Sequence, residues 1–88
     1  MPVTLKQMAA FYWTATLGGF SEASARLNLA QSTVSKRVIE LEETVGAPLI
    51  DRSTRVLRLT RAGEASLAIA AEMLALETRF REAAGGPG

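Results

Sequence analysis

Between residues 20 and 45, apolar and polar positions recur with the period of an α-helix, with one break in the middle. The second half of this stretch carries a single apolar stripe at i, i+4, i+7 and i+11, made of Val34, Val38, Leu41 and Val45. This pattern predicts a helix that begins at Gln31 or Ser32 and ends at Gly46.

A shorter helix is predicted before the break. It is expected to start at Ser21, whose hydroxyl is placed to accept a hydrogen bond from an N–H of the first turn, and Phe20 is placed to pack back on the helix. Ala23 and Leu27 share one face. Asn28 is the expected turn residue, because Asn tolerates a left-handed backbone better than most residues. Two helices joined by so short a turn are typical of a helix-turn-helix.

Residues 4–17 predict a helix that precedes this pair. Thr4 is its expected N-cap, and Gly18 with Gly19 ends it. Its apolar face consists of Leu5, Met8, Phe11 and Ala15. Trp13 lies away from that face on a helical wheel, so it is either an isolated surface residue or a contact with another chain, and we favour the contact.

After Pro48 the pattern changes from helical to alternating. Leu57 and Leu59 are expected on one face of the strand, and Val56 and Arg58 on the opposite face. Residues 53–55 supply a compact turn, so a small β-hairpin with Arg55 at its tip is expected. An isolated two-stranded ribbon is marginal in water and must lie against the helices as a wing. Arg55 is then expected in a minor groove or at a phosphate, and a solvated turn residue is the alternative.

Thr60 is the expected N-cap of a long helix that runs to about Ala84. Gly63 lowers helix propensity in its first turn, which indicates close packing against the wing. Two apolar stripes follow this helix, Leu67, Ala70, Ala71 and Leu74 on one side and Ala62, Ile69, Met73, Leu76 and Phe80 on the other. A domain this small covers one of them, so the second predicts pairing with another copy of the chain. A bundle helix within one chain is the alternative.

The 88 residues therefore predict a mainly α protein with one small domain. A winged helix-turn-helix of three helices and a two-stranded hairpin occupies residues 1–60, a dimerisation helix occupies 60–84, and 85–88 form a flexible end. Cysteine is absent, and the sequence shows neither a secretory leader nor a membrane-spanning run, so we expect a cytoplasmic protein with no membrane partner.

Positive charge gathers in the centre of the chain. The net charge is only +1, but residues 26–61 hold seven basic and four acidic side chains, a balance of +3. The preceding residues balance to zero and the following ones to −2. This distribution favours a localised phosphate-binding face.

The sequence lacks the side chains that most catalytic sites use. Histidine and cysteine are both absent, so Cys/His zinc sites and Ser-His or Cys-His nucleophile pairs cannot form. The acidic residues are scattered and are expected to be solvated on helix faces. We therefore expect no enzyme activity, no metal and no cofactor.

The helix from about residue 31 is polarised along its length. Opposite its apolar stripe lie Ser32, Thr33, Lys36, Arg37 and Glu40, and the second half turns acidic. Short polar side chains and cations at its start can reach base edges and phosphates. Two alternatives remain, an ordinary solvated amphipathic face and a module that docks a partner protein. A docking face would more often expose aromatic residues than hydroxyls and cations.

Three segments together resemble the N-terminal winged helix-turn-helix domain of LysR-type bacterial transcriptional regulators: LKQMAAFYWTA, GGFSEASARLNLAQSTVSKRVIELEETVGAPLIDRS and RLTRAGE. The resemblance runs from about Leu5 to Leu74. It implies a homodimer, paired through the last helix, that binds double-stranded DNA at an interrupted palindrome with a T and an A in the half-sites. The second helix of the motif would lie in the major groove, with the wing beside it.

The resemblance also implies residue roles. Base-reading roles fall to Gln31, Ser32, Thr33, Ser35 and Lys36. Phosphate or groove-edge roles fall to Ser21, Arg37 and Arg55. Our expected dimer contacts are Trp13, Ile69, Met73, Leu76 and Phe80.

Two departures from the family pattern stand out. The family often has Pro where Ser32 stands and Arg where Lys36 stands. Lysine offers a point charge in place of a planar fork, which puts bidentate guanine reading in doubt and indicates a softer sequence preference. Full-length members also carry a larger effector-binding domain, which is absent from this sequence, so any small-molecule effector is expected to act only through that domain.

Overall fold

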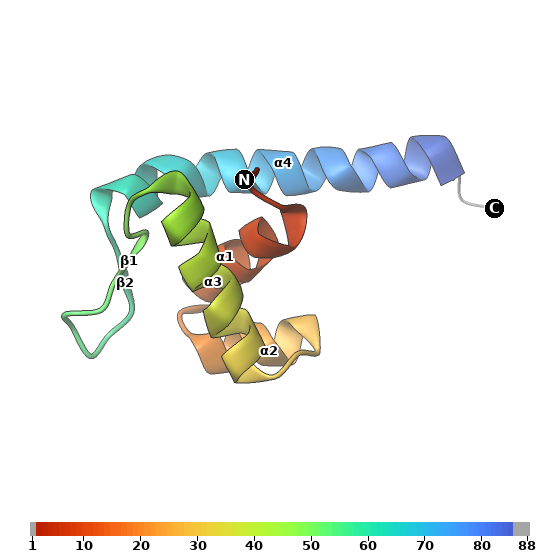
Figure 1. Ribbon diagram of the computed structural model, residues 1–88. Helices are drawn as coiled ribbons and strands as arrows, with labels where there is room; N and C mark the ends of the chain where they lie inside the picture. Colours follow the sequence, from red (N-terminus) through yellow and green to blue (C-terminus); the bar gives the residue numbers. More distant parts are fainter. Residues whose placement is uncertain (1, 86–88) are drawn as a thin grey trace.

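The computed structural model describes residues 2–85 and is mainly helical, with a small two-stranded antiparallel sheet (Figure 1). In chain order the elements are α1 (Leu5–Leu17), α2 (Phe20–Leu27), α3 (Gln31–Val45), β1 (Ile50–Asp51), β2 (Arg58–Leu59) and α4 (Arg61–Gly85). The predicted winged helix-turn-helix with a long last helix is confirmed.

Helix α1 is the centre of the domain and contacts α2, α3 and α4. It begins with a capping box, as Thr4 predicts. The Gln7 N–H donates to the Thr4 hydroxyl oxygen at 3.1 Å, and the Thr4 N–H donates to the Gln7 side chain at 3.1 Å. The backbone N–H groups of Thr4 and Gln7 are thereby both hydrogen-bonded.

The buried face of α1 is wider than predicted. Met8 and Phe11 are buried as expected, but Leu5 is exposed and the prediction for it was wrong. Ala10 and Thr14, which the apolar pattern did not select, are fully buried. Because three helices surround α1, its buried positions spread over more than one stripe.

Helix α2 begins one residue earlier than predicted. Gly19 precedes its first residue, Phe20, and the predicted capping role of Ser21 was wrong. Ser21 lies inside the first turn, where its carbonyl accepts a hydrogen bond of 2.7 Å from the Ser24 hydroxyl. Phe20, the first helical residue, packs against the core.

The turn between α2 and α3 has the predicted left-handed residue, Asn28, at φ 56° and ψ 48°. Helix α3 then runs from Gln31 to Val45 and stops at Gly46, as its period predicts. The first three residues of its apolar stripe are buried: Val34, Val38 and Leu41. Val45 is exposed, contrary to the prediction, because it lines an open apolar groove of about 420 Å³ between α1, α3 and α4.

The wing is a short hairpin in which Ile50 pairs with Leu59 and Asp51 pairs with Arg58. The predicted alternation is confirmed, since Leu57 and Leu59 pack against the core whereas Val56 and Arg58 are exposed. The connection spans residues 52–57, so the compact turn predicted at 53–55 was too short. Within it, the Ser53 N–H donates to the Asp51 carboxylate at 2.9 Å and the Thr54 hydroxyl donates to the Val56 carbonyl at 2.7 Å.

Helix α4 is fixed to the wing at its start. The Thr60 hydroxyl accepts from the Gly63 N–H at 3.0 Å and donates to the Pro48 carbonyl at 2.6 Å, which confirms Thr60 as the cap. A Cβ on Gly63 would lie 2.1 Å from the Leu49 carbonyl oxygen, so only glycine fits there, as expected from its close packing.

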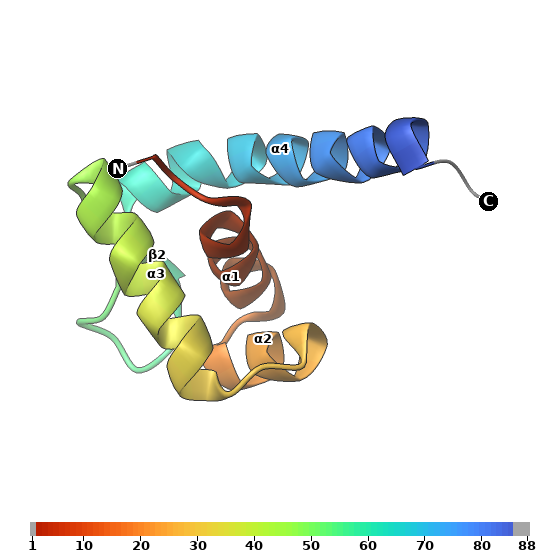
Figure 2. The ribbon, with the colours of Figure 1, turned by 45° about the vertical axis from the view of Figure 1, so that its right-hand side comes forward.

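The second half of α4 projects beyond the other helices (Figures 1 and 2). The helix continues to Gly85, one residue past the predicted end, and the rest of the predicted flexible end, residues 86–88, lies outside the described residues. No helix within residues 2–85 is both long and apolar enough to cross a membrane.

Candidate nucleic-acid interface

The first two turns of α3 present the predicted polar face to solvent. Gln31, Ser32 and Lys36 are exposed, and Thr33, Ser35 and Arg37 are half-buried. Figure 2 shows α3 on the outside of α1, with its first turn next to α2. The structure therefore brings these six predicted residues together on one accessible end of one helix and buries none of them in the core.

The cations at this end of α3 form no ion pair among residues 2–85. Two ion pairs are present in residues 2–85, between Arg52 and Glu42 and between Arg81 and Glu77. Lys36, Arg37 and Arg55 have no carboxylate partner among the described residues, and the first turn of α3 holds no acidic side chain. The positive end of the helix dipole adds to the same potential, which favours phosphate.

The start of α3 also leaves backbone donors open. Ala30 precedes the helix, and its methyl group cannot accept a hydrogen bond. The N–H groups of Thr33 and Val34 donate back to the Ala30 carbonyl, at 3.0 and 3.2 Å. The earlier N–H groups of the first turn are in the arrangement in which helices bind anions.

The wing lies close to the start of α2. Residues of the α1–α2 turn and residues of the wing, including Arg52 and Arg55, line one hollow of about 320 Å³. Arg55 is exposed, and so is Ser21 in the first turn of α2. The two predicted backbone-contacting positions outside α3 therefore come from elements that meet at this hollow, a juxtaposition that no sequence pattern indicated.

Glu42 joins α3 to the wing and was missed by the sequence reasoning, which treated the acidic residues as solvated. Its carboxylate accepts hydrogen bonds from the Leu49 N–H at 2.7 Å and the Ile50 N–H at 3.1 Å. Arg52 donates to it at 3.0 Å, and only 11% of the Glu42 side chain is exposed. The one sequence signal was its position next to Leu41, beside the buried stripe.

The electrostatics of this contact follow from its geometry. Partial burial opposes ionisation of Glu42, but the hydrogen bonds from Arg52 and from the amides of Leu49 and Ile50 outweigh it and lower the pKa of Glu42. In the wing itself, hydrogen bonds from the hydroxyl and the N–H of Ser53 lower the pKa of Asp51.

Trp13 is half-buried and packs against the core, so its predicted position away from the packed face was wrong. The Arg26 guanidinium lies 4.3 Å from the centre of the Trp13 ring, within reach of a cation–π interaction. Tyr12 meets the same ring edge to face at 4.9 Å. Arg26 is thus engaged by an aromatic ring. The role of Trp13 in a dimer stays a prediction.

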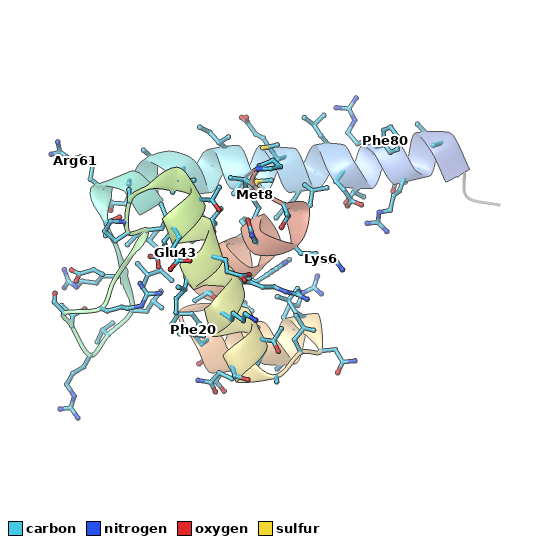
Figure 3. The ribbon with its side chains drawn as sticks, in the orientation of Figure 1. Lys6, Met8, Phe20, Glu43, Arg61 and Phe80 are labelled. Atoms are coloured by element: carbon cyan, nitrogen blue, oxygen red, sulfur yellow. The ribbon has the colours of Figure 1, made fainter. Side chains whose placement is uncertain are left out.

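The rest of the domain covers one of the two apolar stripes of helix α4, as expected. Ala70 is buried and Leu67 packs against the core. The other stripe is exposed at Ile69, Met73, Leu76 and Phe80. Phe80, with 73% of its surface exposed, lies near the free end of α4, beyond the part that covers α1 (Figure 3). Ile69 and Met73 also line the open groove beside Met8, which makes one continuous apolar surface.

Known proteins are similar to this chain in sequence and in fold. An uncharacterized HTH-type transcriptional regulator in the ibpB-leuC intergenic region of Azotobacter vinelandii is 43% identical over 79 residues, 90% of this chain and 55% of that protein. Corynebacterium glutamicum OxyR in an H2O2-bound form matches with a TM-score of 0.92 at 33% identity, covering 100% of this chain and 28% of that chain. The chain therefore spans about half of the first protein and about a quarter of the second.

A third relative has been solved with nucleic acid. Vibrio fischeri DarR, in complex with DNA, matches with a TM-score of 0.86 at 30% identity over 97% of this chain and 30% of that chain. The sequence pattern of bacterial regulatory helix-turn-helix proteins of the lysR family matches residues 5–64. The chain therefore belongs to the lysR family of bacterial regulatory helix-turn-helix proteins and carries the helix-turn-helix DNA-binding domain of that family.

Proposed function

We propose that this chain binds double-stranded DNA sequence-specifically as a homodimer, with α3 in the major groove and the wing at the minor groove or the phosphates. The observation that carries the proposal is the exposed polar end of α3 at Gln31, Ser32 and Lys36, where Lys36 forms no ion pair among the described residues. An α-helix fits the major groove, and residues near the start of a recognition helix are the ones that reach base edges.

The base-reading roles belong to the short polar residues and to Lys36. Gln31 carries a side-chain amide suited to the paired donor and acceptor of adenine, and Lys36 can donate to the acceptors of guanine. Ser32, Thr33 and Ser35 offer hydroxyls to either kind of base. Because lysine has no planar fork, discrimination at the position that Lys36 reads is weaker than an arginine would give.

The backbone-contacting roles fall to Ser21, Arg37 and Arg55. These contacts hold the register of the protein on the duplex and carry no sequence information of their own. The exposed position of Arg55 on the wing and of Ser21 at the start of α2 suits this role, since each lies on an element that borders the same hollow.

Dimerisation uses the exposed stripe of α4. Ile69, Met73, Leu76 and Phe80 expose apolar surface along more than three turns of a helix that projects from the domain. Contiguous exposed apolar surface of this kind marks an interaction site, and a two-fold symmetric contact lets the same stripe serve both subunits. Two copies then present two α3 helices, which fits an interrupted palindrome.

The wider role of the regulator is part of the same proposal. Relatives are longer than this chain. We propose that a small-molecule effector binds a domain of the full protein outside residues 1–88, and that the full protein regulates transcription in the bacterial cytoplasm.

Selection of duplexes from a random pool by the 88-residue chain tests the proposal. We expect enriched sequences with two symmetric half-sites, confirmed by mobility shift. The symmetry reports dimeric binding, and the spacing reports the separation of the two α3 helices. Recovery of no enriched sequence, at salt concentrations low enough to permit phosphate contacts, would contradict the proposed function.

A further inference from the structure

An exposed aliphatic side chain lies among the polar residues on the outer face of α3. Ile39 is 43% exposed, whereas Val34, Val38 and Leu41 of the same helix are buried in the core. At about 100° per residue, Ile39 lies about 20° from Ser32 and about 40° from Ser35 around the helix axis. It therefore shares the face assigned to base reading.

The position of Ile39 along the helix matters as well. It follows Ser35 and Lys36 by about one turn, and the half-buried Glu40 and the exposed Glu43 come next along the helix. Carboxylates are disfavoured next to phosphates, so Ile39 is the last residue of this face before the acidic half of α3 begins. Single exposed aliphatic residues are common on proteins. Ile39 is distinguished by its position at the C-terminal limit of the face assigned to base reading.

The chemistry of the side chain selects its partner. An isoleucine has no donor or acceptor, so it cannot pair with the polar edge of any base. In unmodified DNA, the one apolar group that a base edge presents in the major groove is the C5-methyl of thymine. We propose that Ile39 is a specificity-determining residue that contacts the C5-methyl group of one thymine in each half-site. The proposal rests on the proposed function, because it requires α3 in the major groove.

Replacement of thymine by deoxyuridine removes only this methyl group and leaves the hydrogen-bonding edge unchanged, so it tests the contact directly. The probe is the duplex enriched from the random pool, with the thymines replaced one position at a time in both half-sites. For the unsubstituted protein we expect one position at which the replacement weakens binding by about three- to fivefold per half-site, the effect of one buried methyl-sized group.

The variants identify the side chain responsible. Ile39→Ala should bind the thymine and deoxyuridine duplexes equally at that position, whereas Ile39→Val, which keeps a branched side chain at the same place, should retain most of the difference. Leu5→Ala is the matched control, because Leu5 is also an aliphatic helix residue at 41% exposure but lies in α1, and the deoxyuridine effect should be unchanged in it. Thermal unfolding of all three variants checks that each is folded.

The outcomes separate this inference from the function on which it rests. If the unsubstituted protein binds its duplex specifically and no thymine replacement weakens binding, the inference is overturned and the proposed function stands. If the loss persists unchanged in Ile39→Ala, another residue contacts the methyl group and the inference is again overturned. Failure to bind any DNA specifically would overturn both.

Discussion

The carboxylate of Glu42 lies 2.9 Å from the guanidinium of Arg52, and this pair ties the helix proposed to read DNA to the wing beside it. The same carboxylate holds the amides of Leu49 and Ile50, where the chain enters β1. One side chain thus satisfies three donors from the segment that follows α3. Because the bonds cross from α3 to β1, they fix the position of the wing relative to the first turns of α3.

Removal of this side chain should destabilise the domain. In Glu42→Ala the two amides lose their acceptor, and we expect the free energy of unfolding to fall by about 1–3 kcal/mol. Glu43→Ala is the matched control, since Glu43 is exposed on the same helix and should change stability by less than about 0.5 kcal/mol. Urea unfolding followed by circular dichroism measures the stability of both variants. Equal effects in the two variants would show that the contacts of the Glu42 carboxylate with the wing do not stabilise the domain.

Stability should depend on pH through the same carboxylate. The pKa of Glu42 in the folded state is lower than its ordinary value of 4.5, so the unfolded chain binds more protons in the acidic range. The contribution is fully present above about pH 4.5 and is lost as the pH falls through the folded-state pKa. We expect the free energy of unfolding to decrease on acidification.

The variant Glu42→Gln isolates this effect, because the amide oxygen can still accept hydrogen bonds but does not titrate. Its unfolding free energy should vary less between about pH 7 and about pH 3 than that of the parent protein. Asp51, whose pKa is also lowered, contributes with the same sign and leaves a residual slope. An unchanged slope in Glu42→Gln would show that Glu42 titrates normally.

Close packing at the start of α4 gives a further prediction. Gly63→Ala places a Cβ 2.1 Å from the Leu49 carbonyl oxygen, a backbone atom that cannot move without shifting the wing. We expect a loss of about 1–3 kcal/mol from overpacking, although alanine is the better helix former by about 1 kcal/mol. Gly85→Ala, where a Cβ meets nothing within 4 Å, should be neutral or slightly stabilising. Thermal unfolding of the pair provides the comparison.

Replacement of Lys36 and replacement of Arg55 should affect DNA binding in different ways. Lys36→Ala should weaken specific binding by about 1–3 kcal/mol and relax the preference at the position that it reads. Arg55→Ala should weaken binding evenly across sequences and reduce the salt dependence, the slope of log K against log salt, by about one. Mobility shifts with specific and scrambled duplexes at several salt concentrations distinguish these patterns. No change in either variant would show that the reading face has been assigned to the wrong residues.

The oligomeric state should depend on the exposed stripe of α4. Met73→Glu combined with Leu76→Glu places two charges on that stripe and should give monomers in sedimentation experiments. Glu72→Gln and Thr78→Ala, at exposed α4 positions outside the stripe, serve together as the control and should leave the mass unchanged. A dimer that survives the paired glutamates would indicate that the subunits meet elsewhere.

Most of the fold was predictable because it depends on local period and local caps. The stripe of Val34, Val38 and Leu41 placed α3, and Thr4, Thr60 and Asn28 marked helix starts and a turn that the structure confirms. These signals involve residues within a few positions of one another, so the sequence expresses them directly.

The errors arose where distant elements meet. The burial of Ala10 and Thr14 depends on the three helices that pack around α1, and α2 begins at Phe20, whose side chain packs against the same core. In the same way, the wing turn is wider than its composition indicated. No local period encodes such contacts, because they depend on how elements far apart in the chain are oriented.

By itself, the sequence determined the helices, the wing and the polar character of residues 31–37, since each follows from spacing and side-chain chemistry along a short stretch. Only the tertiary structure decided which of these side chains face solvent, that Glu42 turns inward to hold the wing, and that Ile39 stays exposed on the outer face of α3. The physical reason is that exposure and hydrogen bonding are properties of the packed assembly of helices. They become fixed when α1, α3, α4 and the wing close around one core.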